Sequence, residues 1–133
     1  MWDLSIAHSR WIMTSISASA EALAYQMAVL DRYLDLPDTP LRISVSDQQQ
    51  AQRWFQCGIP WPLVETALLL GSLRRLLRPQ SAPRLAPVRS LAYFQPVVEE
   101  LLQAPVPDSY RTYLQRKMQA YLRTPPELKD SPC

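Results

Sequence analysis

The chain has 133 residues, of which 47% are hydrophobic and 20% charged, a composition typical of one globular domain rather than of a disordered chain. It contains two glycines and thirteen prolines. Strand-rich folds need glycine in their turns, whereas these prolines separate apolar periodic segments, so the sequence predicts an all-α fold. No run approaches the roughly 20 consecutive apolar residues of a membrane-spanning helix, and we expect no membrane partner.

The net charge of +2 is distributed unevenly along the chain. Residues 1–70 hold four basic and seven acidic side chains, whereas residues 71–124 hold nine basic and three acidic ones. This asymmetry indicates an anionic partner for the second half of the chain.

The two cysteines, Cys57 and Cys133, form neither a disulfide framework nor a metal-ligand cluster. Two free thiols, together with a start that does not have the form of a secretory signal, favour a cytoplasmic location.

The first helix is expected at about residues 17–35. Its apolar residues recur at helical spacing and share one face, which predicts that this face is buried: Leu23, Met27, Leu30 and Leu34. The first dozen residues have no clear period, and residues 1–16 are expected to form an arm, either strand-like or a short helix. Pro37 and Pro40 end the first helix.

A second helix is expected from the capping-box pattern of Ser46–Gln49 and runs to about Cys57. Three of its residues should point inward: Ala51, Trp54 and Phe55. Gly58 follows where a left-handed terminating residue is wanted.

The third helix, at about Trp61–Arg78, is the most apolar segment and is predicted to be the central core helix. Gly71 within it costs about 1 kcal/mol relative to alanine, and a close helix crossing would explain this glycine. Residues 79–89 follow as a proline-punctuated, semi-rigid loop.

Two further helices are expected after this loop. Ser90 should cap the next segment, whose regular part begins at Pro96 after a short first turn. Asp108 or Ser109 should cap the last helix, which ends near Arg123.

The sequence therefore predicts a compact bundle of about five helices with proline-rich connections. Residues 1–124 should form a single helical domain that includes the arm at residues 1–16, and residues 125–133 a flexible tail.

No catalytic apparatus is evident in the sequence. The sole histidine, His8, lies in the poorly patterned arm, and Cys57 is expected at a helix C-terminus, where the dipole raises a thiol pKa. Gly58 and Gly71 cannot build a glycine-rich phosphate loop, and no side chains have metal-ligand spacing. We therefore expect a non-enzymatic protein with no catalytic residue, metal, cofactor or small-molecule substrate.

Basic side chains remain as the candidates for function. They lie at the end of the third helix, in the loop after it and on the last helix: Arg74, Arg75, Arg78, Arg84, Arg89, Arg111, Arg116 and Lys117. Arginines near tyrosines can hold phosphates and stack on bases, which predicts a nucleic-acid interface. The alternatives are a merely solvated basic face, with cations that offset a helix dipole, and an acidic protein partner.

The turn at Gly58 does not predict a DNA-reading helix-turn-helix. A recognition helix needs polar side chains in its first turns, whereas the helix after this turn begins with apolar core residues at Trp61–Leu68.

Two stretches carry a resemblance to known proteins: QRWFQCGIPWPLVETALLLGSLRRL and, after the loop, VRSLAYFQPVVEELL. They resemble uncharacterised bacterial helical proteins linked to mobile elements. The layout of about residues 46–102 is also similar to the helical domain of DnaD-like replication-initiation proteins, in which a helix that carries a Trp, a core helix and an aromatic-bearing helix pack together. The resemblance implies a DNA-associated role but assigns no DNA contact to a particular residue.

Together these patterns predict a helical binding module that is associated with nucleic acid as an accessory of replication or of a mobile element. The alternative is a protein–protein adaptor or a subunit of a larger complex.

Overall fold

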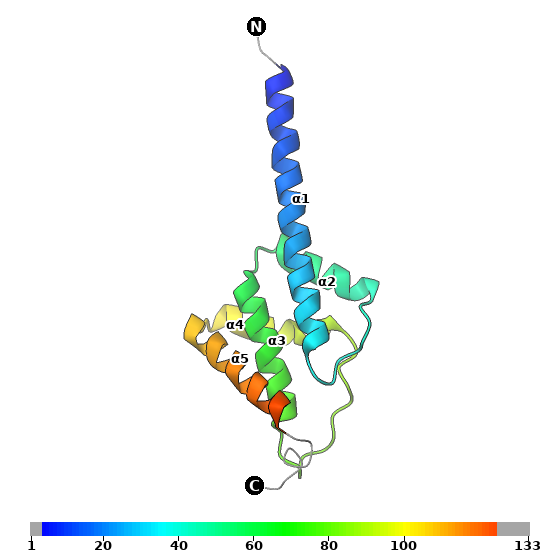
Figure 1. The fold of residues 1–133 in the computed structure, drawn as a ribbon, viewed down its shortest axis with the longest axis vertical. Coiled ribbons are helices and arrows are strands. Elements are labelled where there is room, and N and C mark those ends of the chain that lie inside the picture. Colours follow the sequence, from blue (N-terminus) through cyan, green and yellow to red (C-terminus); the bar gives the residue numbers. More distant parts are fainter. Residues whose placement is uncertain (1–3, 125–133) are drawn as a thin grey trace.

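A computed structural model describes the backbone of residues 4–124 and the side chains of residues 19–124. Within this range the chain forms five α-helices and one 3-10 turn, and no strand: α1 (Leu4–Asp35), α2 (Val45–Gln56), α3 (Trp61–Leu76), η1 (Leu91–Phe94), α4 (Gln95–Gln103) and α5 (Asp108–Arg123) (Figure 1). The prediction of an all-α bundle of five helices is confirmed. The expected tail at residues 125–133 lies outside the described residues.

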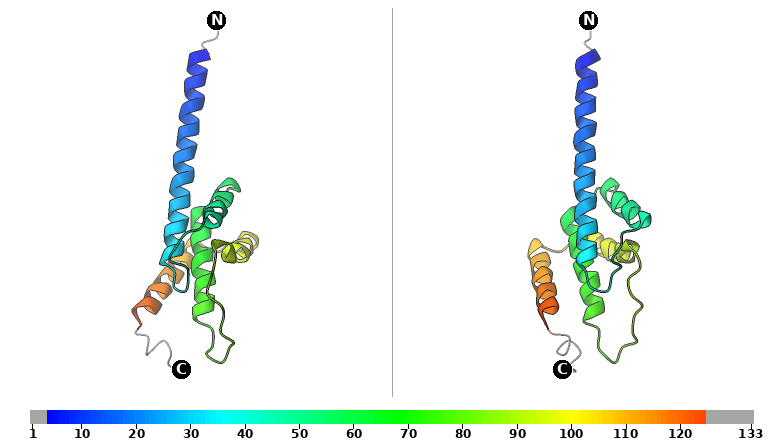
Figure 2. Two further views of the ribbon diagram at one scale, coloured as in Figure 1. Left: turned by 90° about the vertical axis from the view of Figure 1, so that its right-hand side faces the viewer. Right: turned by 45° about the vertical axis from the view of Figure 1, so that its right-hand side comes forward.

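Helix α3 is the centre of the fold, as its apolar sequence predicts. Every residue from Val64 to Leu73 is buried, and the helix packs against α1, α4 and α5. Figure 2 shows α3 running between α4 and α5. A helix that is apolar on all sides needs neighbours on all sides, and this arrangement provides them.

Gly71 marks a close crossing of α3 with η1 and α4, as expected. A methyl group at this position would lie only 2.8 Å from Cδ1 of Phe94 and 3.4 Å from Cγ2 of Val97. Phe94 is fully buried, so the absence of a side chain at Gly71 lets the aromatic ring lie directly on the helix backbone.

The capping box of α2 is formed by Ser44 and Asp47. The Asp47 N–H donates to Ser44 Oγ (3.1 Å), and the Ser44 N–H donates to Asp47 Oδ2 (3.0 Å). The box predicted at Ser46–Gln49 is therefore wrong by two residues. A tertiary contact favours the observed register, because Asp47 is buried and its Oδ1 also accepts the Leu91 N–H (2.9 Å), which joins α2 to η1.

Of the residues predicted to point inward from α2, Ala51 and Trp54 are buried and Phe55 is half-buried. The indole Nε1 of Trp54 donates to Oε1 of Gln95 at 2.6 Å, so this buried N–H is satisfied. Gly58 ends the helix at a φ of 72°, the left-handed conformation expected there.

The first helix is much longer than predicted. It begins at Leu4, so residues 4–16 are its first turns rather than a separate strand-like arm. The N-terminal part of α1 stands away from the rest of the molecule (Figure 1).

The prediction of a buried face on α1 is correct only near the body. Leu30 is buried and Leu34 is half-buried, but Leu23 and Met27 are 57% and 55% exposed. The helix instead turns Val29 and other buried residues toward α2 and α3. Helical periodicity identifies an apolar face, but it does not identify what covers that face.

The last two helices begin with proline rather than with side-chain caps. Pro96 lies in the first turn of α4, after the short η1 turn, as predicted, but the Ser90 side chain makes no capping hydrogen bond. At α5 the N-cap residue is Pro107 and no side chain caps the helix. The expectation that Asp108 or Ser109 caps it is therefore wrong, because both residues are already helical.

Candidate nucleic-acid interface

The loop between α3 and η1 is fixed to the body at both of its ends. Three of its residues are prolines, which restrict its backbone: Pro79, Pro83 and Pro87. Near its end the Val88 side chain is buried, and the Val88 N–H donates to the carbonyl oxygen of Asp38 at 3.1 Å. The loop is therefore positioned by the α1–α2 connection as well as by α3.

Arg75, in the last turn of α3, is the main anchor of this loop. Its Nη2 donates to Asp38 Oδ2 (2.8 Å) and to the carbonyl oxygen of Ala86 (2.6 Å), and Nη1 donates to the hydroxyl of Tyr93 (3.2 Å). The guanidinium carbon lies 5.0 Å from the Tyr93 ring centroid, within the range of a cation–π contact. Only 7% of the Arg75 side chain is exposed, so this arginine is structural and has little surface left for a ligand.

Asp38 has a φ of 62°, a conformation that Asp tolerates better than most residues. This turn directs both its carbonyl oxygen and its carboxylate toward the 79–89 loop. No sequence pattern predicts this role, since Asp38 and Arg75 are separated by 37 positions.

Two other arginines in the predicted interface are held by internal acceptors. Arg74 makes two parallel hydrogen bonds of 2.7 Å to the carboxylate of Glu100 on α4, and these bonds hold the pKa of the Glu100 carboxyl below its ordinary value. Arg78 donates to the carbonyl oxygen of Pro83 at 3.0 Å. This acceptor is neutral, so the charge of Arg78 has no counter-ion there.

Arg111 on α5 belongs to an ionic cluster around Glu65 of α3. The Glu65 carboxylate lies 3.0 Å from Nη2 of Arg32 on α1 and 3.7 Å from Nε of Arg111, and it accepts a 3.0 Å hydrogen bond from Gln115. Glu65 is buried. The cluster therefore links three helices, and Arg111 is part of the packing rather than of a free surface.

The other two predicted residues on α5, Arg116 and Lys117, are exposed. Lys117 donates to the Tyr113 hydroxyl at 3.2 Å, and its Nζ lies 5.5 Å from the Tyr113 ring centroid. Arg116 makes no hydrogen bond or ion pair with another residue of the described range. Neither cation is neutralised by a described carboxylate.

Arg84 and Arg89 are exposed on the 79–89 loop, and neither forms a hydrogen bond or ion pair within residues 4–124. Arg84 lines an open groove of about 800 Å³ together with Arg78 and with Tyr121 of α5. Arg89 lines a neighbouring hollow of about 450 Å³ beside Tyr93. Arg75 and Leu85 contribute to both hollows, so the two surfaces lie side by side along the loop.

The structure thus divides the eight predicted residues into two groups. Arg74, Arg75 and Arg111 are paired with carboxylates of the same chain, whereas five have no carboxylate partner among the described side chains: Arg78, Arg84, Arg89, Arg116 and Lys117. Tyr121 of α5 and Gln80 of the loop also line the groove. Tyr121 comes beside Arg78 and Arg84 only in the folded chain, because α5 and the loop are distant in the sequence.

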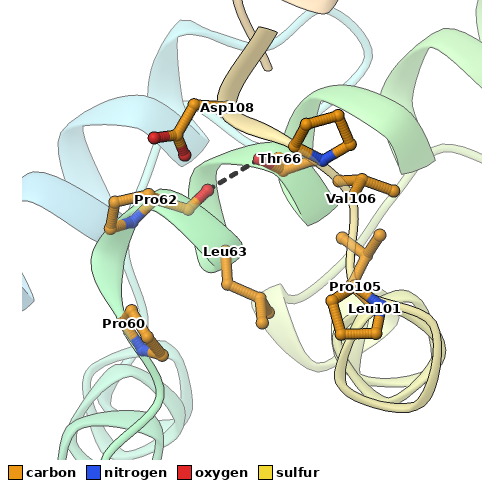
Figure 3. A pocket seen from close by; sticks show the side chains of 9 residues that line it. Pro60, Pro62, Leu63, Thr66, Leu101, Pro105, Val106 and Asp108 are labelled. Atoms are coloured by element: carbon orange, nitrogen blue, oxygen red, sulfur yellow. Dashed lines mark hydrogen bonds between the residues drawn. The ribbon is translucent and has the colours of Figure 1, made fainter. Parts of the chain in front are cut away.

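A separate hollow of about 260 Å³ lies between the start of α3 and the connection from α4 to α5 (Figure 3). Leu63 and Leu101 line it together with four prolines, and Asp108 lies at its edge. The hydroxyl of Thr66 in its wall donates to the Pro62 carbonyl oxygen at 2.7 Å. The hollow is apolar and no basic side chain lines it, so it is not part of the basic surface.

Within the described range no group of three or more His, Cys, Asp or Glu side chains could hold a metal ion. The Cys57 thiol is exposed, and His8 is among the residues whose side chains are not described. In the same part of the chain no helix has both the length and the apolar character needed to cross a membrane.

Comparisons with protein-family models, curated proteins and solved structures found no match to this chain. The similarity to mobile-element proteins and to DnaD-like domains therefore stays a prediction, and the functional argument depends on the chain's own residues.

Proposed function

We propose that this protein is a non-enzymatic helical module that binds nucleic acid, as an accessory of replication or of a mobile element. The observation that carries the proposal is the pair Arg84 and Arg89, which are exposed on an anchored loop without a carboxylate partner among the described residues. Because the backbone of this loop is anchored by Val88 and Arg75, phosphate binding costs less ordering entropy than it would on a flexible loop.

The phosphate contacts are assigned to the cations that the fold leaves uncompensated. Arg78 and Arg84 line one groove with Tyr121, and Arg89 extends the basic surface along the loop. An aromatic side chain beside two arginines suits a nucleic-acid strand, because the arginines bind the backbone while a base stacks on the ring.

This mode of binding is expected to depend weakly on sequence. The N-terminal turns of α3, which follow the Gly58 turn, are largely buried in the core and offer no polar side chains for base edges in a major groove. Phosphate contacts from a loop position a protein on nucleic acid but do not read its sequence.

The test is binding of fluorescein-labelled single-stranded and duplex DNA and RNA, measured by fluorescence anisotropy at low salt. The double variant R84E/R89E reverses two charges in the proposed interface, and it should weaken binding at least about tenfold. The matched control is R42E/R53E, which makes the same change of net charge at exposed positions before α3. Equal effects of the two variants, or no binding by the wild type, would overturn the proposal.

The second candidate is a subunit of a larger protein assembly. It is favoured by α1, whose N-terminal part stands away from the body (Figure 1). A pull-down from the native host, analysed for both protein and nucleic acid, distinguishes the two candidates, since an assembly subunit would retain a defined protein after nuclease treatment.

A further inference from the structure

The N-terminal part of α1 has no support from the rest of the fold among the described side chains. Tyr25 is the first α1 residue with a described contact to the body: its hydroxyl donates to the Ile59 carbonyl oxygen at 2.8 Å and its ring lies 5.3 Å from that of Phe55. The 21 residues from Leu4 to Ala24 extend about 30 Å at the rise of an α-helix. In proteins most of the stability of a helix comes from packing of its apolar face rather than from helix propensity, so this segment favours a partner that covers that face.

The apolar residues of α1 recur with a heptad spacing. From position 6 to position 34, eight of the nine a and d positions are apolar: Ile6, Met13, Ile16, Ala20, Leu23, Met27, Leu30 and Leu34. The exception is Ser9. Four heptads of this kind are enough to indicate a coiled coil. We call these nine positions the α1 seam.

Among the described side chains, the α1 seam faces away from the body at Ala20, Leu23 and Met27, whereas Leu30 is buried and Leu34 is half-buried. The body-facing side of α1 is marked by Val29 and Tyr33, both fully buried. At 100° per residue, Leu23 lies roughly 80° from Tyr33 and roughly 120° from Val29, and Met27 lies roughly 120° or more from both, which agrees with the exposure of 57% for Leu23 and 55% for Met27. The α1 seam is therefore open to a partner at Ala20, Leu23 and Met27, and it joins the core of the body at Leu30.

We propose that α1 pairs with α1 of a second copy of this chain, through the α1 seam, to form a coiled-coil dimer. A heptad seam is complementary to itself, because each a and d side chain fits between the side chains of an identical helix. The flanking e and g positions hold only two charged residues, Arg10 and Asp31, so two copies bring no run of like charges together.

The charge of α1 argues against a membrane surface as the occupant. An interfacial helix of that kind carries a strongly charged, often basic, polar face opposite its apolar face. Between Leu4 and Ala24 the formally charged residues of α1 are Arg10 and Glu21 alone, so the helix has neither a basic face nor a net charge there. A second neutral helix fits this surface better.

Sedimentation equilibrium of the full chain over a range of micromolar concentrations tests the dimer. Reducing buffer is required, because Cys57 is exposed and could form an adventitious disulfide. The wild type should sediment with twice the 15.3 kDa chain mass. L23E and M27E should each raise the dissociation constant about 100-fold or more, since either one places a charge in the paired seam.

Leu23 and Met27 are both exposed in the single chain, so L23E and M27E should leave the fold of the body intact. An unchanged midpoint of urea unfolding verifies this. A24E is the matched control, because Ala24 is exposed, adjacent in sequence and outside the α1 seam; it should stay dimeric. A monomeric wild type, or equal dissociation by L23E and A24E, would contradict the proposal. The proposal is independent of nucleic-acid binding, since none of these positions lies in the basic surface.

Discussion

At the scale of single residues, Gly71 and Asp47 determine how separate segments meet. Gly71 allows Phe94 to lie on α3, and Asp47 joins the start of α2 to η1 through two backbone N–H groups. The sequence predicts the close crossing at Gly71, because a glycine within an apolar helix lowers its stability relative to alanine unless a neighbouring segment needs the space. It does not predict the role of Asp47, whose partner Leu91 is 44 positions away.

Replacing Gly71 with alanine should destabilise the fold. In an exposed helix the change would add about 1 kcal/mol of stability. Here the new methyl group would lie 2.8 Å from a ring carbon of Phe94, and overpacking of this kind costs about 1–3 kcal/mol. Urea unfolding measures the difference as a lower midpoint, and a raised midpoint would contradict the proposed close crossing.

Tyr33 should reduce the stability of the fold in alkaline solution. Burial raises the pKa of its hydroxyl to about 12 from 10, so the unfolded chain ionises first. The stability due to the neutral hydroxyl is complete below pH 10 and is lost as the pH rises through about 12.

The variant Y33F keeps the ring contact with Phe94, which has a centroid distance of 6.3 Å. It should equal or exceed the wild type in stability at pH 7, because the Tyr33 hydroxyl is buried without a hydrogen-bond partner among the described residues. Between pH 10 and pH 12 its advantage should grow to as much as about 2 kcal/mol. Urea unfolding of Y33F and wild type at pH 7 and at pH 12 measures this difference. An advantage of Y33F that shrinks at high pH would be evidence against a raised pKa of Tyr33.

At the scale of elements, the 79–89 loop depends on α3 for its position. Arg75 bonds to the α1–α2 connection, to the loop and to η1 through one guanidinium group. Lysine cannot reproduce this arrangement, because it has one charged nitrogen instead of a planar fork of donors.

The variant R75K should release the loop and expose it to protease. We expect trypsin to cleave after Arg84 and Arg89 several-fold faster than in the wild type, with the cleavage sites identified by mass spectrometry. The control R74K alters the exposed pair with Glu100 on the α4 side and should leave these rates unchanged. Identical cleavage of R75K and wild type would mean that the prolines and the contact of Val88 with Asp38 hold the loop without Arg75.

The sequence predicts the elements of this fold better than their ends. Periodicity and prolines identify the helices, and the apolar character of α3 identifies its central place. Neither signal predicts that α1 begins at Leu4, because no proline marks its start and only Ile6, Met13 and Ile16 carry the heptad spacing before residue 17. The start of α2 was missed by two residues because SVSD and SDQQ both fit a capping pattern, and only the contact of Asp47 with η1 selects the first.

At the scale of the whole molecule, the sequence shows the excess of positive charge after residue 70. It does not show which of these basic side chains remain without a carboxylate partner and can bind a ligand. Three of the eight predicted residues are paired with carboxylates of the same chain, namely Arg74, Arg75 and Arg111. Those partners lie on other elements, so counting charges along the chain overestimates the free basic surface. What remains is a smaller set of cations around the 79–89 loop and on the exposed side of α5.

The most direct test of the nucleic-acid proposal is the salt dependence of duplex DNA binding by the wild type and by R84Q/R89Q. A plot of the logarithm of affinity against the logarithm of salt concentration should be a straight line with a negative slope. The slope should be less steep by about 2 in the variant, because each lost phosphate contact removes about 0.9 from its magnitude. An affinity that does not change with salt, or equal slopes for the two proteins, would contradict the proposal that these two arginines bind phosphate.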